Sequence, residues 1–207
     1  MIEKIFRLNH DAFRIEGEKV VYTDPFKLSA GEPKADLILI SHDHFDHCSP
    51  EDIEKVVQDS TTMLAPQSCR AQLEPLPGTL RIIAPGESIE AQGVTVEAVP
   101  AYNVDKDFHP KDNGWVGYIF TLGGQRIYHA GDTDHIPEMK ELRADIALLP
   151  VSGTYVMTAE EAIAAAEDIG PEVVIPMHYD DIVGTADDAQ RFAAGYSGKT
   201  VIKEQTR

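Results

Sequence analysis

Three of the eight histidines of the chain lie within the six residues from His42 to His47. From Ser41 onward the order is Ser-His-Asp-His-Phe-Asp-His, so two carboxylates share the window with the imidazoles. Imidazole nitrogen and carboxylate oxygen together suit zinc, iron or manganese, and cysteine ligands of a closed structural zinc site are absent. Side chains of this kind, packed together, need a cation to be ordered. We therefore expect a catalytic metal site rather than a polar loop that only caps a helix near Pro50.

The spacing within the window indicates how many ions it serves. His42 and His44 are two residues apart, so in extended backbone both side chains can face the same ion. Asp46 and His47 follow an aromatic residue, where the chain turns toward the next element, and can reach a second ion nearby. The sequence predicts one or two divalent transition-metal ions, with zinc as the first candidate and manganese or iron as alternatives.

The elements around this window are expected to place it at a sheet edge. Residues 36–40 form a short apolar run before the window, typical of a strand buried on both faces. Open α/β sheets build ligand sites at the carboxyl ends of such strands. A helix is predicted to follow from Pro50 to Val57, with Ser49 as its N-cap. Other strands are predicted at 4–8, 12–15, 19–22, 80–83, 94–99, 115–122, 126–129, 145–149 and 173–177, and helices at 135–142, 158–169 and 187–194.

The pattern His-x-His-x-Asp-His resembles the signature of the metallo-β-lactamase-fold superfamily, and the similarity extends along nearly the whole chain. Asp24 at the end of an early strand matches the first family motif, Asp132 the metal-bridging aspartate, and His178 the late histidine that closes a strand. The resemblance implies an α+β fold, the αββα four-layer sandwich of the metallo-β-lactamase type. It also implies a role for Asp24 in orienting a ligand, and metal ligands at His42, His44, Asp46, His47, Asp132 and His178.

Segment 149–155, followed by 158–162, narrows the resemblance to the branch that includes ascorbate-6-phosphate lactonases and N-acyl-phosphatidylethanolamine phospholipases. The chain departs from that branch at the third motif, where Asn103 stands in the place of a histidine ligand. His109 is the first candidate to complete the shell of the first ion. The alternatives are Asn103 itself, whose amide oxygen suits harder ions, and an open or water-filled position.

Composition limits the class of protein and its partners. At 207 residues and 43% hydrophobic content, the chain is expected to form one domain over 1–207. No apolar run is long enough for stable membrane insertion, and the start lacks the apolar stretch of a secretory signal. Cys48 and Cys69 make no disulfide framework, so we expect a cytoplasmic protein.

The formal net charge of −17 arises from 18 basic and 35 acidic residues, and no basic cluster is present. We therefore expect no nucleic-acid partner, and we expect the substrate to be a small, anionic molecule.

Three further histidines are expected outside the metal set: His10 at the surface in a turn, His129 packed within a strand, and His135 exposed. The oligomeric state is left open.

The expected reaction is hydrolysis by a metal-bound hydroxide, with Asp46 and Asp132 as the catalytic residues. Asp132 would bridge two ions, and Asp46 would ligate the second ion and carry a proton to the leaving group. The leading substrate class is a small anionic ester or lactone. The alternatives are a phosphodiesterase acting on a cyclic nucleotide or phospholipid head group, and a metal-binding protein without catalysis, which Asn103 motivates. Weaker candidates for substrate contact are Tyr155, Tyr179 and Lys111. The two tyrosines can equally be packed aromatic residues, and Lys111 can equally be an exposed lysine without a role.

Overall fold

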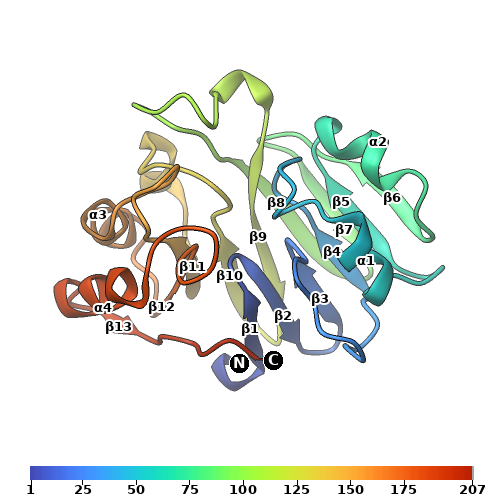
Figure 1. The fold of residues 1–207 in the computed structure, drawn as a ribbon, viewed down its shortest axis with the longest axis horizontal. Coiled ribbons are helices and arrows are strands. Elements are labelled where there is room, and N and C mark those ends of the chain that lie inside the picture. Colours follow the sequence, from blue (N-terminus) through green and yellow to red (C-terminus); the bar gives the residue numbers. More distant parts are fainter. Residues whose placement is uncertain (207) are drawn as a thin grey trace.

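Two β-sheets packed face to face form the centre of the computed structural model, which describes residues 1–206 (Figure 1). The first sheet begins with antiparallel strands and continues with parallel ones. Its six strands, in spatial order, are β1 (Ile5–Asn9), β2 (Ala12–Glu16), β3 (Val20–Thr23), β4 (Leu37–Leu39), β5 (Thr62–Ala65) and β6 (Thr79–Ile82).

The second sheet has seven strands in the order β13-β12-β11-β10-β9-β8-β7. The strands from β7 to β10 are antiparallel, and those from β10 to β13 are parallel. Their bounds are β7 (Ser88–Ala91), β8 (Val94–Pro100), β9 (Val116–Leu122), β10 (Gln125–His129), β11 (Ile146–Pro150), β12 (Val173–Met177) and β13 (Lys199–Thr200).

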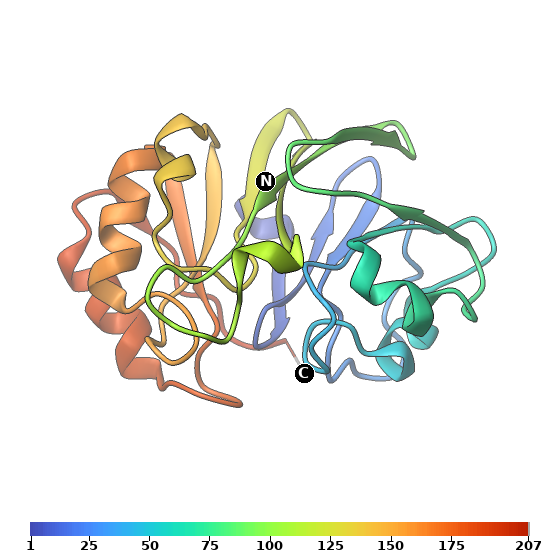
Figure 2. The same cartoon turned by 90° about the horizontal axis from the view of Figure 1, so that it is seen from above.

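Helices cover the outer face of each sheet. Figure 2 shows the two sheets between the early helices on one side and the late helices on the other. The early pair packs on the first sheet and the late pair on the second. The αββα sandwich expected from the sequence is confirmed. The four helices are α1 (Pro50–Val56), α2 (Arg70–Leu73), α3 (Ala159–Ile169) and α4 (Ala186–Gly195), and the short 3-10 segments are η1 (Ile2–Lys4), η2 (Gln67–Cys69), η3 (Lys111–Asn113) and η4 (Pro137–Glu141).

The strand before the metal loop is buried on both faces, as its apolar run predicted. Leu37 and Leu39 of β4 belong to the core between the sheets, whereas Ile38 packs with the helix-facing cluster. Successive side chains of a strand point to opposite faces, so a continuous apolar run suits a strand covered on both sides. The residues that follow β4 therefore leave the sheet at an edge between two packed layers.

Helix ends follow the predicted signals. Ser49 caps α1 by accepting a hydrogen bond from the backbone N–H of Asp52. Thr158 and Glu161 form a capping box at the start of α3, the helix predicted at 158–169. The α3 helix ends at Gly170, whose φ of 68° lies in the left-handed region that glycine tolerates.

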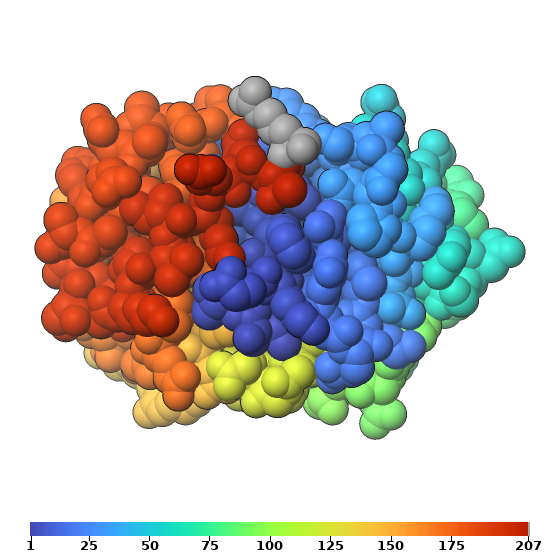
Figure 3. Space-filling view, turned by 90° about the horizontal axis from the view of Figure 1, so that it is seen from below, coloured from blue at the N-terminus to red at the C-terminus, as the bar shows by residue number. Residues whose placement is uncertain are grey.

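The two sheets are joined by a hydrogen bond near the metal loop. The hydroxyl of Tyr118 in β9 donates to the carbonyl oxygen of Ile40 (2.7 Å) and lies 3.2 Å from that of Leu64. The end of the chain lies against its beginning: Gln205 pairs with Arg7 beside β1, and Figure 3 shows the late residues in red next to the early ones in blue. Within residues 1–206, none of the helices is long and apolar enough to cross a membrane.

Three strands and one helix differ from the sequence prediction. The sequence analysis did not predict the strands β5, β7 and β13. The helix predicted from His135 to Leu142 is the 3-10 segment η4, Pro137–Glu141.

Candidate metal centre

The metal loop lies between β4 and α1, and Asp24 holds both of its ends. Oδ1 of Asp24 accepts the backbone N–H of Ser41 (2.7 Å), and Oδ2 accepts its hydroxyl (2.6 Å). Oδ2 also lies 2.8 Å from Nδ1 of His47. Asp24 thus has the orienting position that the sequence implied, because a carboxylate on Nδ1 leaves Nε2 free for a ligand.

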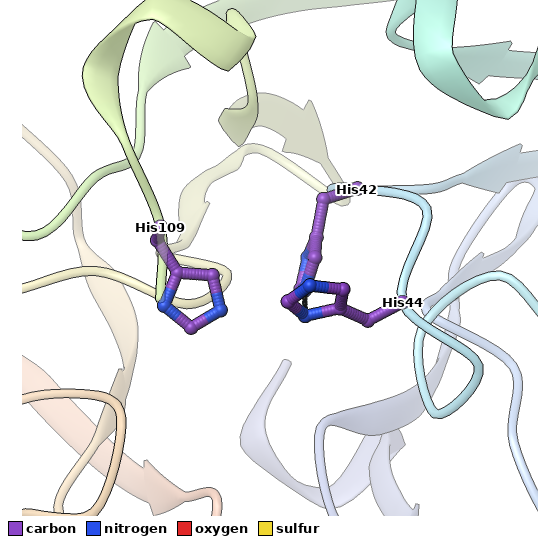
Figure 4. A group of neighbouring side chains, drawn as sticks. All are labelled: His42, His44 and His109. Carbon is purple, nitrogen blue, oxygen red and sulfur yellow. Dashed lines mark hydrogen bonds between the residues drawn. The ribbon is translucent and has the colours of Figure 1, made fainter. Parts of the chain in front are cut away.

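The first group of candidate ligands consists of His42, His44 and His109. Figure 4 shows His109 approaching from one side and the two loop histidines from the other, with the rings directed toward each other. One ring nitrogen of each lies within 4.8 Å of the others, which is close enough to hold a single ion. Trp115 packs against the rings of His42 and His44, with centroids 4.8 and 4.9 Å apart.

The second group consists of Asp11, His47, Asp132 and His178, all of them buried. Nε2 of His47 lies 3.4 Å from Oδ1 of Asp132, and Nε2 of His178 lies 3.3 Å from Oδ2 of the same carboxylate. Oδ2 of Asp132 is also 3.2 Å from Nε2 of His109 in the first group. Asp132 therefore lies between the two groups, where a carboxylate can contact an ion on either side.

Asp46 lies at the edge of the second group rather than within it. Its Oδ2 atom is 3.7 Å from Nε2 of His47 and 3.8 Å from Nε2 of His10. Its side chain is 12% exposed, whereas that of Asp132 is 4% exposed. The structure thus brings the predicted metal residues to one place, with Asp46 on the side that faces solvent.

His10 is not at the surface, and this expectation was wrong. Its side chain is fully buried, and its ring lies 4.1 Å from that of His178. The backbone N–H of His178 donates to the carbonyl oxygen of His10 at 3.3 Å, so the β1–β2 turn is folded beneath the end of β12. Burial, together with the imidazoles of His178 and His47, lowers the pKa of His10 to about 2. Its ring is therefore neutral at ordinary pH.

Asp11, in the same turn, is the candidate ligand that the sequence analysis missed. Asn, His and Asp are ordinary turn residues, so the sequence Asn9-His10-Asp11 gave no sign of a buried site. A usable signal would have been that the β1–β2 turn meets the same edge of the sheets as the metal loop. His129 is a packed strand residue, as expected, and its Nε2 atom lies 3.0 Å from the carbonyl oxygen of Asp11.

The remaining candidates lie apart from both groups. His135 is partly buried rather than exposed, and its Nε2 atom lies 2.7 Å from a carboxylate oxygen of Asp168. Tyr179 is buried against Arg7, and Lys111 is paired with Glu138. Cys48 and Cys69 are buried free thiols.

Two residues of the site have left-handed backbone conformations that are rare outside glycine. The φ angles are 42° for Asp24 and 59° for His178. Such conformations cost on the order of 1–3 kcal/mol each, and they gather at functional sites, where the surrounding structure holds them. Here they occur where the chain leaves β3 and β12, directly at the residues whose side chains face the second group.

Burial and neighbouring charges shift the pKa values of several candidate ligands in the metal-free protein. Burial lowers the pKa of His42 well below its usual range, and the imidazole of His47 acts in the same direction. Burial alone would raise the pKa of Asp132, but the imidazoles of His178 and His47 outweigh it and hold that pKa well below normal. Burial raises the pKa of Asp11 well above its ordinary value. Asp132 is therefore ionised and His42 neutral at ordinary pH, as metal ligands must be.

The same side chains leave buried polar atoms without hydrogen bonds. They include Nε2 of His47 and His109, both carboxylate oxygens of Asp11, and Oδ1 of Asp132. Buried polar groups in proteins are nearly always paired, and two carboxylates beside each other repel. Divalent cations between them would satisfy these atoms at once. The donor set therefore fits a metal centre of nitrogen and oxygen ligands.

Both groups open onto a cavity of about 310 Å³. Its floor contains side chains from both groups together with Asp46, and its walls are mainly apolar. The cavity is lined by His10, His44, Phe45, Asp46, Phe108, His109, Asp132, Tyr155, His178, Ile182 and Val183.

This chain is similar to known proteins over most of its length. A family model described as a beta-lactamase superfamily domain matches residues 4–178. A UPF0173 metal-dependent hydrolase of Thermoplasma acidophilum is 35% identical, with 96% of this chain and 94% of the relative covered. One from Thermococcus onnurineus is also 35% identical, with 91% and 90% covered.

Solved structures agree with the sequence comparison. A Parabacteroides distasonis protein assigned to the metal-dependent hydrolases has a TM-score of 0.84 at 32% identity, with 98% of this chain and 93% of that one covered. Igni18, a metallo hydrolase of Ignicoccus hospitalis, has a TM-score of 0.79 at 25% identity, with 98% and 95% covered. The chain therefore belongs to the metallo-β-lactamase superfamily and, within it, to the UPF0173 metal-dependent hydrolases.

Proposed function

We propose that this metal-dependent hydrolase holds two divalent ions and cleaves a small ester or lactone. The observation that carries the proposal is the position of Asp132. Its two carboxylate oxygens lie 3.2 Å from Nε2 of His109 in one group and 3.4 Å from Nε2 of His47 in the other. A carboxylate shared by two groups of ligands is the arrangement that a two-ion hydrolytic centre requires.

The two groups differ in the ligands that they offer. His42, His44 and His109 supply only nitrogen, which favours zinc, whereas the second group adds the oxygens of Asp11 and Asp132 and also suits manganese or iron. These side chains would hold divalent ions, which would supply Lewis-acid chemistry by lowering the pKa of water toward about 7 and polarising a carbonyl oxygen.

Asp46 is the group that we assign to proton transfer. Its side chain lines the cavity, and its Oδ2 atom lies 3.7 Å from Nε2 of His47 and 3.8 Å from Nε2 of His10. A carboxylate in this position can take a proton from water and return it to the leaving oxygen. His10, 3.8 Å away, is neutral and therefore forms no ion pair with Asp46.

The lining of the cavity favours an ester or lactone over a phosphodiester. None of the lining residues within 1–206 is a lysine or arginine, which phosphoryl-transfer sites use to neutralise charge. The resemblance of segment 149–155 does not separate the two classes, because the branch that it resembles includes both lactonases and phospholipases. The expectation of an anionic substrate is supported only by the positive charge of the bound ions, which would attract an anion. The alternative of a metal-binding protein without catalysis was based on Asn103 standing in place of a histidine ligand. It is disfavoured because Asn103 lies behind His109, against its Nδ1 atom, and does not take the place of its ring.

Other parts of the proposal rest on composition. The net charge of −17 and the dispersed basic residues support a small-molecule substrate and no nucleic-acid partner. Buried free thiols at Cys48 and Cys69 support a cytoplasmic, reducing location.

The test measures metal content and hydrolysis together. Protein loaded with zinc or manganese is assayed with a neutral aryl ester, a simple lactone and a bis-aryl phosphodiester, and ions per chain are counted by elemental analysis. We expect two ions and turnover of the ester or lactone. Asp132→Ala should lose at least one ion and reduce turnover at least about a hundredfold. Asp112→Ala, at an exposed position in η3, is the matched control. Full metal loading with unchanged turnover in Asp132→Ala would refute the proposal.

A further inference from the structure

The large apolar side chains that remain exposed gather at one place on the molecule. Within residues 1–206 the most exposed are Phe45 (69%), Val104 (64%) and Phe108 (53%), followed by Tyr155 and Ile182. All of these except Val104 line the cavity over the metal centre. Single exposed apolar residues are ordinary, but a contiguous set around a cavity marks a binding surface.

Four separate connections supply these side chains. Phe45 lies between β4 and α1, Phe108 between β8 and β9, Tyr155 between β11 and α3, and Ile182 between β12 and α4. Two of the walls are held by ring packing: Phe108 lies against Tyr155 with centroids 4.5 Å apart, and Phe45 against Phe26 at 5.8 Å. The apolar wall is thus assembled from distant parts of the chain around the candidate ligands.

Three lysines on connections beside the cavity are paired with carboxylates. Nζ of Lys27 lies 2.7 Å from Asp181, and Nζ of Lys106 lies 2.6 Å from Asp134. Lys111 is likewise paired with Glu138, at 2.8 Å. With no lysine or arginine among the lining residues, the walls offer nothing to a charged tail and much to a hydrocarbon one.

We infer that the group next to the scissile bond is an uncharged alkyl chain, which packs between Phe45, Phe108 and Ile182 while the carbonyl faces the metal centre. This inference rests on the proposed function and adds the substrate class to it. A cavity of about 310 Å³ suits a short to medium chain, with the substrate as a whole still a small molecule. Each methylene moved from water to this wall should strengthen transition-state binding about fourfold.

The test is a series of aryl esters of acetic, butyric and hexanoic acid with the metal-loaded protein. We expect kcat/KM to rise by at least tenfold from acetate to hexanoate, and the neutral hexanoate ester to be preferred over the anionic monoester of adipic acid. Phe45→Ala and Phe108→Ala should each reduce the hexanoate-to-acetate ratio at least fivefold. Val104→Ala removes an exposed apolar residue outside the cavity and should leave the ratio unchanged.

The outcomes separate the inference from the proposed function. Hydrolysis with a flat series, or with the adipate monoester preferred, overturns the alkyl-chain inference alone. If no ester or lactone is hydrolysed, the proposed function fails. The alkyl-chain inference is then decided by the binding of n-alkanols, measured by calorimetry. Affinity that rises from butanol to octanol and falls in Phe108→Ala supports it, whereas equal or undetectable binding of these alcohols overturns it.

Discussion

Asn103 fixes the orientation of His109 through a single oxygen. Oδ1 of Asn103 accepts the backbone N–H of His109 (2.9 Å) and lies 3.0 Å from its ring atom Nδ1. The amide nitrogen of Asn103 donates to Asp134 at 3.0 Å, so its oxygen must be the atom that faces His109. Nδ1 of His109 therefore carries the proton, and the lone pair of Nε2 is directed at the metal centre.

Replacing Asn103 by Ala should weaken metal binding without removing a ligand. Loss of the orienting oxygen leaves Nδ1 of His109 with the carbonyl oxygen of Tyr155 alone, 3.2 Å away, and partners of this kind contribute about 10- to 100-fold in metal affinity. Competition with a coloured chelator measures the effect. Asn113→Ala, at an exposed position in the same connection, is the control and should bind normally. Equal affinities in the two variants would show that Asn103 has no orienting role.

Replacing Asp11 by Asn should have opposite effects on the two forms of the protein. Both oxygens of Asp11 are buried without hydrogen bonds, so the metal-free protein contains a carboxyl group that burial disfavours. We expect the metal-free variant to gain about 1 kcal/mol in the free energy of unfolding, and the loaded variant to bind its second ion at least about tenfold more weakly. Thermal unfolding with and without chelator measures both. Asp59→Asn, at an exposed site, is the control. A shift of the same sign in both forms would contradict a ligand role for Asp11.

Tyr118 and Tyr128 allow a matched comparison of buried hydroxyls. The hydroxyl of Tyr118 donates to the carbonyl oxygen of Ile40 across the two sheets. The hydroxyl of Tyr128 has no partner within the described residues, although its side chain is fully buried. Tyr118→Phe should lower the free energy of unfolding by about 1–2 kcal/mol because a buried carbonyl loses its donor. Tyr128→Phe should be neutral or stabilising. Urea unfolding of both variants measures the difference, and the reverse order would show that the bond to Ile40 contributes nothing.

Removing metal should lower the stability of the whole fold. An ion that binds only the native state, at a free concentration 1,000 times its Kd, stabilises that state by about 4 kcal/mol. Treatment with a chelator should therefore lower Tm by several degrees, and adding zinc or manganese back should restore it. A Tm that is independent of metal would mean that the two groups of ligands hold no ion in the native protein.

The sequence predicted most of the fold because its elements carry strong local signals. The helix predicted at 158–169, the strands predicted at 115–122 and 126–129, and the strand of the apolar run before His42 are all present. The short strands β5 and β13 lack such signals, since their pairing partners rather than their own residues make them strands.

The site was less predictable, because its composition depends on long-range packing. The loop histidines share one short window, so their proximity could be read directly from the sequence. His10 and Asp11 look like any polar turn, and only the packing of that turn under β12 buries them. His109 likewise joins the first group only because the connection from β8 to β9 brings its ring close to those of His42 and His44.

The ligands of the second group come from nearly the whole length of the chain. Asp11 lies in the first hairpin, and His178 follows the penultimate strand, 167 positions later. Contacts of such high sequence separation form late in folding, because the loop between them must close first. During synthesis the N-terminal half would emerge with its metal loop but without Asp132 and His178. The complete centre can therefore be loaded only after translation has passed His178, so metal capture reports that both halves of the protein have docked.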